Sequence, residues 1–299
     1  METQNNKKLN SVSGGMLFTI LMLVFIIFSF LFQSIVGAII KPTEKAYVYI
    51  CSLSSPLVLA GMTIFISVKY KEERREIFPI RKFSLMSLLY TALIGGGMLF
   101  AFGFINGLIV KLIEAMGLMV SELNIALDTP LDSIISLVVI ALLPAITEEL
   151  FFRGVVINSI KSDNKLSIAF LSAFIFALYH CSATQFVYQF IYGFILAILF
   201  MYSKSLIPTM IVHFMNHFLI LTFEFFKLNV NLYNILIIIG GLVAVVVPVT
   251  LILINLLKGD HAEKKPLKER DSARFIVPFG LFGILFCLVI AISNLFMVA

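Results

Sequence analysis

Three ionisable side chains, Glu148, Glu149 and Arg153, lie within a stretch of sequence that is otherwise apolar enough to cross a membrane. An ionisable residue at the centre of a spanning helix costs about 2.5 to 3.5 kcal/mol on insertion scales. Residues that carry this cost generally face a polar cavity, where they do chemistry or conduct a solute. We therefore expect this cluster to be the functional centre of the protein.

The helical spacing separates the roles of the two acids. Glu149 and Arg153 are four residues apart and share one helix face, so we expect them to pair inside the membrane. Glu148 points about 100° away from that face. This geometry predicts that Arg153 holds Glu149 ionised, while Glu148 is free to act as a base. The alternative is that Glu148 is a structural acid in the same ion-pair network.

A histidine follows in the next apolar segment, where Phe176 and His180 lie one helical turn apart. Glu148 and His180 are each about 15 residues from the 159–165 connection, so an antiparallel hairpin rising about 1.5 Å per residue brings them to similar depth. We expect His180 to join the acidic cluster. The alternative for a lone membrane histidine is a hydrogen bond between helices.

A third polar patch contains His213, Asn216 and His217, whose spacings of three and four residues place them on one helix face. These side chains are candidate hydrogen-bond donors or metal ligands, or polar contacts between helices. Four further residues are candidates for lining the same cavity from segment 185–203. They are Gln185, Tyr188, Gln189 and Tyr192.

The elements that must position these residues are membrane helices. The chain has 299 residues, of which 60% are hydrophobic and 13% charged, and its mean hydropathy is +1.05. These values predict an all-α polytopic membrane protein with about eight to nine spans, because the apolar runs are too long and too even for a membrane β-barrel. The first run exceeds the apolar core of a signal peptide, about 7 to 15 residues, so we expect it to stay as an anchor. The nine predicted segments are 14–40, 46–68, 84–110, 131–158, 166–182, 185–203, 206–226, 232–257 and 275–299.

Charge predicts the orientation of these helices. Segments 69–82 and 258–274 each carry six basic residues, and basic connections remain on the cytoplasmic side. We expect a cytoplasmic N-terminus and an integral multi-pass protein of a bacterial cell membrane. The net charge of +5 then reflects membrane topology, and we expect the lipid bilayer rather than nucleic acid as a partner.

The depth of the acidic cluster follows from the length of its segment. Residues 131–158 would span about 42 Å as one continuous helix, which exceeds the apolar core of a bilayer, about 30 Å. We expect Pro144 to kink this helix one turn before the acids. The parity of the basic connections alone would place Glu148, about 22 Å along its helix from the 159–165 connection, in the outer half of the bilayer core. The extra length of the segment instead favours a site near mid-membrane.

The sequence divides into four predicted regions: a cytoplasmic tail (1–13), N-terminal helices (14–130), a catalytic core (131–227) and C-terminal helices (228–299) with a basic loop at 258–274. Five glycines between positions 95 and 107 predict that segment 84–110 packs closely on a neighbouring helix. Cys51, Cys181 and Cys287 are odd in number and scattered through apolar segments, so no disulfide framework is expected. We interpret Cys181 as a buried thiol rather than a nucleophile.

The three motifs Glu148-Glu149-x-x-x-Arg153, Phe176-x-x-x-His180 and His213 with Asn216 resemble the CPBP family. This family comprises the CAAX-protease and bacteriocin-processing intramembrane endopeptidases, also called Abi. The resemblance covers about a third of the chain, roughly residues 131–220. It implies peptide-bond hydrolysis in the membrane, with Glu148 and His180 activating a water and the third-motif histidine, here His213, stabilising the oxyanion with an asparagine.

The chain departs from the family pattern at one position. The family's asparagine usually stands four residues after the third-motif histidine, where this sequence has His217, and Asn216 lies one residue earlier. The second oxyanion donor is therefore either Asn216 or His217. The chemistry itself agrees with the residues present, because peptide hydrolysis needs an activated water, a general acid and donors for the oxyanion.

Two alternatives remain open at this point. Glu148, His180, His213 and His217 would make an acceptable zinc shell, although the chain has no HExxH motif and the resemblance favours a mechanism without a cofactor. A non-catalytic immunity, scaffold or transport protein is the alternative of a different class. Transport would predict inverted repeats and broken helix pairs, which the sequence does not show. The substrate, a membrane-associated protein or peptide precursor, is not specified further.

Overall fold

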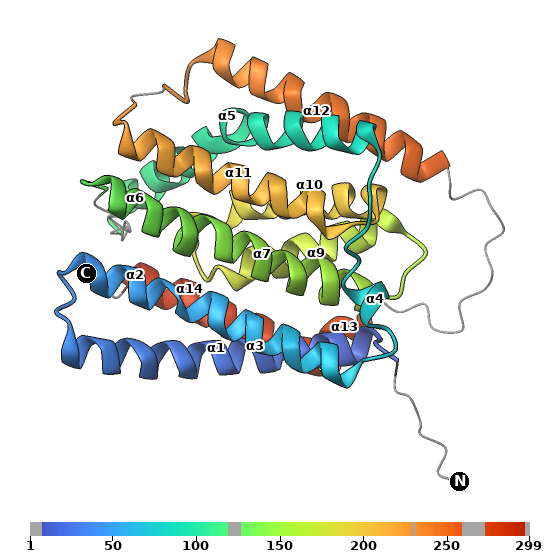
Figure 1. Ribbon diagram of the computed structural model, residues 1–299, viewed down its shortest axis with the longest axis horizontal. Coiled ribbons are helices and arrows are strands. Elements are labelled where there is room, and N and C mark those ends of the chain that lie inside the picture. Colours follow the sequence, from blue (N-terminus) through green and yellow to red (C-terminus); the bar gives the residue numbers. More distant parts are fainter. Residues whose placement is uncertain (1–7, 119–126, 229–230, 259–272, 297–299) are drawn as a thin grey trace, which may run out of the picture.

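The computed structural model describes residues 8–118, 127–228, 231–258 and 273–296, and every regular element in these ranges is a helix (Figure 1). This confirms the predicted all-α membrane fold. Among the described residues, seven helices are long and apolar enough to cross a membrane. Two of the nine predicted segments, 166–182 and 275–299, contain shorter apolar helices, Lys165–Tyr179 and Leu281–Asn294.

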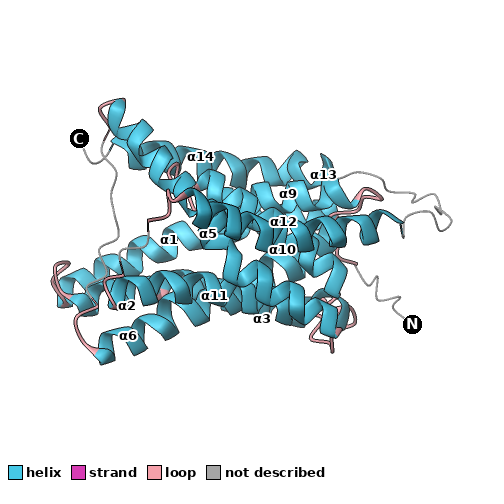
Figure 2. Ribbon diagram, turned by 90° about the horizontal axis from the view of Figure 1, so that it is seen from above, coloured by secondary structure: helices cyan, strands magenta, loops and turns pink. Residues whose placement is uncertain are grey.

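The helices form three layers (Figure 1). Seen from above, the layers overlap and the long helices run along the length of the molecule (Figure 2). In the first, α1 (Ser11–Ile39) packs against α3 (Ser54–Lys69), α13 (Ala273–Phe275) and α14 (Leu281–Phe296). In the third, α5 (Leu85–Ala115) packs along α12 (Ile235–Lys258). Between them lie α9 (Lys165–Tyr179), α10 (Phe186–Ser203), α11 (Leu206–Phe225) and the helix that carries the acids. The predicted N-terminal region 14–130 therefore contributes α1 and α3 to the first layer and α5 to the third.

The remaining helices are short or are parts of longer ones. Helix α2 (Lys45–Ser52) precedes α3 and is separated from it only by Leu53. The short helix α4 (Arg74–Ile77) lies in the basic connection before α5. The last span begins with a π-helical segment, η4 (Ile276–Gly280), in which Val277 has non-helical backbone angles. The basic loop predicted at 258–274 lies mostly outside the described residues.

The connections predicted to be cytoplasmic meet at one end of the bundle. The Ser11 hydroxyl donates to the Ser159 carbonyl at 3.2 Å, and the Leu206 amide donates to the Pro79 carbonyl at 2.9 Å. Lys165 donates to the carbonyl of Leu256, near the end of α12, also at 2.9 Å. The start of α1, the end of the acid-bearing helix and the end of α12 therefore lie together, as the predicted alternation of connections requires.

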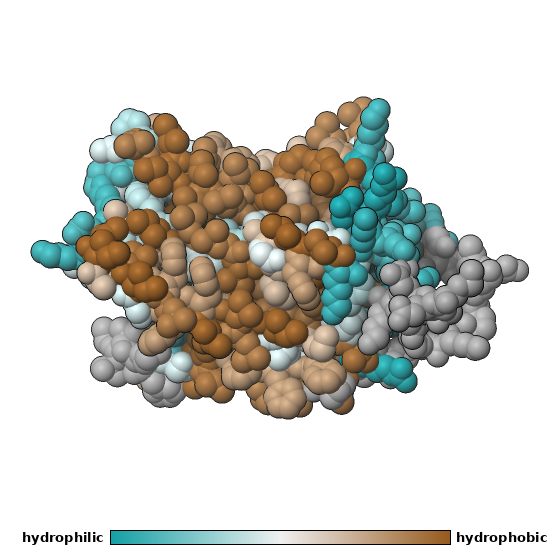
Figure 3. All heavy atoms as spheres, turned by 60° about the horizontal axis from the view of Figure 1, so that its bottom comes forward, coloured by the Kyte–Doolittle hydropathy of each residue, from teal (hydrophilic) through white to brown (hydrophobic). Residues whose placement is uncertain are grey.

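Acidic and aromatic contacts mark the opposite end. Lys45 pairs with Asp128 at 2.7 Å and Asp132 at 2.9 Å, which joins the start of α2 to the start of α6 (Pro130–Ser136). Lys111 lies 4.7 Å from the ring centre of Tyr233, which joins α5 to the residues before α12. Between the two ends, apolar side chains cover the visible face, and hydrophilic residues gather at the ends (Figure 3). This pattern is expected for a protein whose middle contacts lipid.

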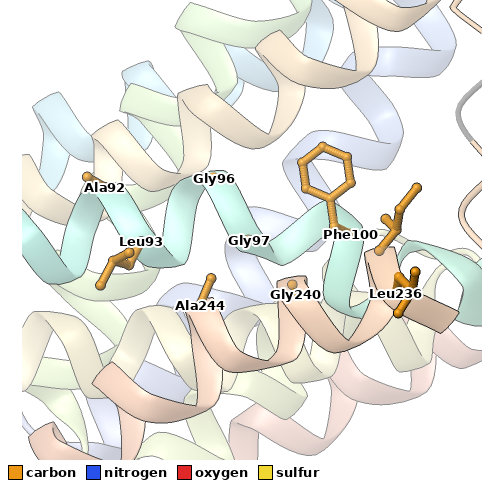
Figure 4. Close-up of a pocket in the computed structure, with 10 residues that line it drawn as sticks. Ala92, Leu93, Gly96, Gly97, Phe100, Leu236, Gly240 and Ala244 are labelled. Carbon is orange, nitrogen blue, oxygen red and sulfur yellow. The ribbon is translucent and has the colours of Figure 1, made fainter. Parts of the chain in front are cut away.

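Glycine allows α5 and α12 to approach closely. A Cβ atom on Gly97 would lie 2.8 Å from the Cβ of Ala244, and one on Gly241 would lie 2.4 Å from the backbone nitrogen of Ala101. The predicted close-packing role of the α5 glycines is therefore confirmed. A groove of about 440 Å³ follows this seam and is lined by apolar residues such as Phe100 and Leu236 (Figure 4). It contains no group that could do acid–base chemistry.

Candidate active site

The acids lie on one continuous helix, residues 130–159, which alternates between α- and π-helical hydrogen bonding. Segment α7 (Leu143–Glu149) carries both glutamates and is flanked by π-helical segments η1 (Leu137–Leu142) and η2 (Leu150–Val156). The helix ends with α8 (Ile157–Ser159). π-helical turns of this kind occur mostly within α-helices and often at functional sites. Pro144 is the second residue of α7 and follows η1 closely, where it supplies no N–H to the preceding turn.

Glu148 lies well inside this helix, and its depth in the membrane stays a prediction. Glu148 and Ser159, the last helical residue, are separated by 159 − 148 = 11 positions, or about 16 Å at the rise of an α-helix. That distance is about half the thickness of the apolar core of a bilayer, about 30 Å.

Glu149 and Arg153 form the predicted ion pair. Glu149 Oε1 lies 3.1 Å from Arg153 Nη1, and neither side chain is exposed. Arg153 also donates through Nη2 to the carbonyl of Gly193 at 3.3 Å, and its guanidinium lies 4.5 Å from the ring centre of Phe176. Because an unpaired buried charge is strongly destabilising, this pair explains how Arg153 can be buried in an apolar bundle.

His213 is oriented by the same glutamate. Its Nδ1 lies 2.8 Å from Glu149 Oε1. The carboxylate can only accept, so Nδ1–H donates, and in the neutral imidazole Nε2 is left as an acceptor. That Nε2 lies 3.2 Å from Nε2 of His217, and the two rings stack with centres 5.1 Å apart. In the neutral pair, His217 therefore donates to His213.

His180 presents an acceptor atom to Glu148. Its Nδ1 lies 2.9 Å from the Phe176 carbonyl, which can only accept, so Nδ1 carries the hydrogen and Nε2 is free. Glu148 Oε2 lies 3.9 Å from this Nε2 and 3.9 Å from His213 Nε2. These distances are too long for direct hydrogen bonds, but one water molecule can contact Glu148 Oε2 and His180 Nε2 together.

The burial of Glu148 limits which groups can bind beside it. Its side chain is 8% exposed, and its Oε2 has no hydrogen-bond partner among the described residues. Acceptor atoms of Glu148 and His180 thus converge on one region, where the complementary group must supply hydrogens. Helix α9 ends at Tyr179. His180 therefore lies directly after the helix, whereas the predicted segment 166–182 included it.

Asn216 faces a neighbouring helix. The Tyr188 hydroxyl donates to Asn216 Oδ1 at 2.6 Å, and both residues are buried. The ring of Tyr192 meets the His213 ring edge-on, with centres 5.6 Å apart. Of the four candidates on segment 185–203, the two tyrosines contact the third motif, whereas Gln185 precedes α10 and is exposed.

The alternative zinc shell would need several donor side chains placed around one point. Within the described ranges, no group of three or more His, Cys, Asp or Glu side chains is placed to hold a metal ion. Both nitrogens of His213 are already engaged, with Glu149 and His217.

Cys181 is a buried free thiol next to His180, and its left-handed backbone angle, φ 48°, turns the chain away from α9.

The fold and this site define an integral membrane protein with a buried glutamate–histidine centre. Residues 130–219 match the family described as Type II CAAX prenyl endopeptidase Rce1-like. The matched residues contain all three motifs, and the match confirms the resemblance inferred from them. None of the curated proteins and none of the solved structures matches the chain.

Proposed function

We propose that the protein is an intramembrane endopeptidase that hydrolyses a peptide bond of a membrane-associated protein or peptide precursor. Glu148 and His180 activate the water in this proposal. The observation that carries it is the convergence of Glu148 Oε2 and His180 Nε2, 3.9 Å apart, within a largely buried site. Two acceptors at this separation suit a water that donates one hydrogen to each.

The proposed reaction uses Glu148 as base and then as acid. Glu148 takes one proton from the water while His180 Nε2 accepts the second hydrogen and orients the oxygen. The oxygen attacks the carbonyl carbon, and its negative charge moves to the former carbonyl oxygen. Glu148 then returns the proton to the leaving nitrogen as the C–N bond breaks, which releases an amine and a carboxylic acid.

The other motif residues orient the groups that carry out this step. Arg153 neutralises Glu149, and Glu149 fixes the tautomer of His213. Such supporting contacts hold catalytic groups in the productive geometry before the substrate arrives. Phe176 supplies both the carbonyl that orients His180 and the ring that covers Arg153.

We propose that this mechanism needs no metal ion. The contact of His213 Nε2 with His217 Nε2 at 3.2 Å supports this view, because a zinc ligand must offer a free lone pair to the metal. Total metal on the purified protein tests it. Less than about 0.1 zinc per chain with full activity supports the proposal, whereas about one zinc per chain, removed together with activity by a chelator, would replace it with a zinc mechanism.

A proteomic comparison of membranes tests the proposed function and identifies the substrate. Cells that contain the wild-type protein are compared with cells that contain Glu148→Ala. Glu114→Ala serves as a matched control, because Glu114 is an exposed acid near the end of α5. We expect fragments of a membrane-associated protein or peptide that appear with the wild type and the control but not with Glu148→Ala. Identical fragments in all three membranes would contradict proteolysis by this site. A substrate with a prenylated CAAX terminus, a pheromone or bacteriocin leader, or a membrane regulator would each fit the site.

A further inference from the structure

We infer that Tyr188 is a positioning residue that fixes the Asn216 amide so that Nδ2 donates to the oxyanion. This inference rests on the proposed protease function. It assigns the oxyanion donor that the sequence left open between Asn216 and His217 to Asn216.

The contact between the two side chains sets the orientation of the amide. The Tyr188 oxygen lies 2.6 Å from Asn216 Oδ1. This length is typical of O–H···O hydrogen bonds, whereas N–H···O bonds cluster near 2.9 to 3.0 Å. The Tyr188 hydroxyl is therefore the donor and Oδ1 the acceptor. With Oδ1 engaged, the two hydrogens of Nδ2 remain available to another acceptor.

Tyr188 is itself held in place by its neighbours. Its ring stacks on that of Tyr192, with centres 6.0 Å apart and planes 12° apart. The Tyr192 ring in turn packs edge-on against His213. A continuous set of contacts thus runs along one face of α10, from the Asn216 amide to the imidazole of His213. Such rigid support lowers the cost of orienting a donor during the reaction.

The histidines of the same helix cannot replace this donor in their neutral form. His213 commits Nδ1–H to Glu149, and its Nε2 accepts from His217. His217 then has its one hydrogen engaged and keeps only an acceptor nitrogen. Asn216 Nδ2 carries two hydrogens at any pH, so its ability to donate a hydrogen bond does not depend on protonation.

The test measures purified full-length protein in proteoliposomes, with the substrate whose fragment depends on Glu148. Asn216→Ala is expected to lower kcat about 10²- to 10³-fold, as does loss of one oxyanion donor. Tyr188→Phe is expected to lower kcat about 10- to 100-fold, with KM little changed. Losses of this size are typical in metal enzymes when a residue that only orients a metal ligand is removed. The double variant should be no slower than Asn216→Ala, because the two residues act as one unit.

Two further variants separate positioning from general damage. Tyr202→Phe removes a hydroxyl from the same helix at a ring that packs against Tyr90, 5.7 Å away, and should keep the wild-type kcat. Asn216→Asp keeps the oxygen that Tyr188 binds but loses the Nδ2 donor, so its kcat should fall as in Asn216→Ala. Thermal unfolding of each variant shows whether the fold is retained.

Three results would overturn the inference while the protease remains active. They are wild-type kcat in Tyr188→Phe, losses from Tyr188→Phe and Asn216→Ala that multiply in the double variant, or a larger loss in His217→Ala than in Asn216→Ala. Failure of the proposed function itself looks different, because the wild type would then cleave no more substrate than Glu148→Ala.

Discussion

His213 and Glu149 are joined by a contact of 2.8 Å between Nδ1 and Oε1, although they are 64 residues apart in sequence. The same oxygen of Glu149 lies 3.1 Å from Arg153. Glu149 therefore has two partners, a guanidinium on its own helix and an imidazole on α11. This dual contact leaves the neighbouring Glu148 as the acid that faces His180, which is the basis of the roles proposed for the two glutamates.

Removal of Arg153 should damage folding as well as chemistry. Arg153→Ala would leave the carboxylate of Glu149 buried without its cation, a loss of about 3 to 5 kcal/mol. The expected result is a low yield of protein and a lower unfolding temperature in detergent. Fluorescence size-exclusion chromatography of the variant against the wild type measures the yield.

A double variant separates the two roles of Glu149. Glu149→Gln combined with Arg153→Met removes both buried charges and should recover much of the yield. Its activity should stay low, because a neutral amide does not fix the tautomer of His213 as a carboxylate does. Normal expression of Arg153→Ala, with no gain in the double variant, would show that the pair does not stabilise the fold.

Two adjacent glycines on α5 give a matched test of helix packing. A Cβ on Gly97 would lie 2.8 Å from Ala244 and 3.1 Å from the Gly241 carbonyl, whereas one on Gly96 would have no atom within 4 Å. Gly97→Ala should lower stability by about 1 to 3 kcal/mol through overpacking. Gly96→Ala should be neutral or slightly stabilising, because alanine favours the helix. Equal unfolding temperatures for the two variants would contradict the close approach of α5 and α12.

Thiol labelling tests the membrane face to which the site opens. Single cysteines replace Thr147, Ala183 or Gln185 in a background without Cys51, Cys181 and Cys287. An impermeant thiol reagent is then added from each side of sealed vesicles. We expect labelling from the side that carries the basic connections, as for a protease with cytoplasmic substrates. Labelling only from the other side would indicate an outward-facing cavity and substrates that arrive during or after export.

The sequence predicts much of this architecture because its signals are local. Runs of about 20 apolar residues define spanning helices, and a spacing of four residues is sufficient to pair Glu149 with Arg153. The two short helices were harder to delimit. The predicted segment 166–182 extended past Tyr179, where α9 ends, although the polar residues His180 and Ser182 follow closely.

Contacts between helices depend on rotation about each helix axis, which an apolar sequence does not specify. The glutamines of segment 185–203 are the more polar candidates, yet Tyr188 and Tyr192 face the site. The contact of His213 with Glu149 was likewise not predicted, since either glutamate lies within reach of α11. The packing of α1 against α14 joins the two ends of the chain, and no local pattern encodes it.

The most direct test of the central claim is the cleavage rate of purified Glu148→Gln and His180→Ala in proteoliposomes. Glutamine keeps the shape of the side chain but cannot take a proton from water, and the His180 change removes the second acceptor. Both variants should insert and purify like the wild type and lose at least about 10⁴-fold in kcat, as expected for members of one catalytic unit. Full activity in Glu148→Gln would contradict a mechanism in which Glu148 activates the water.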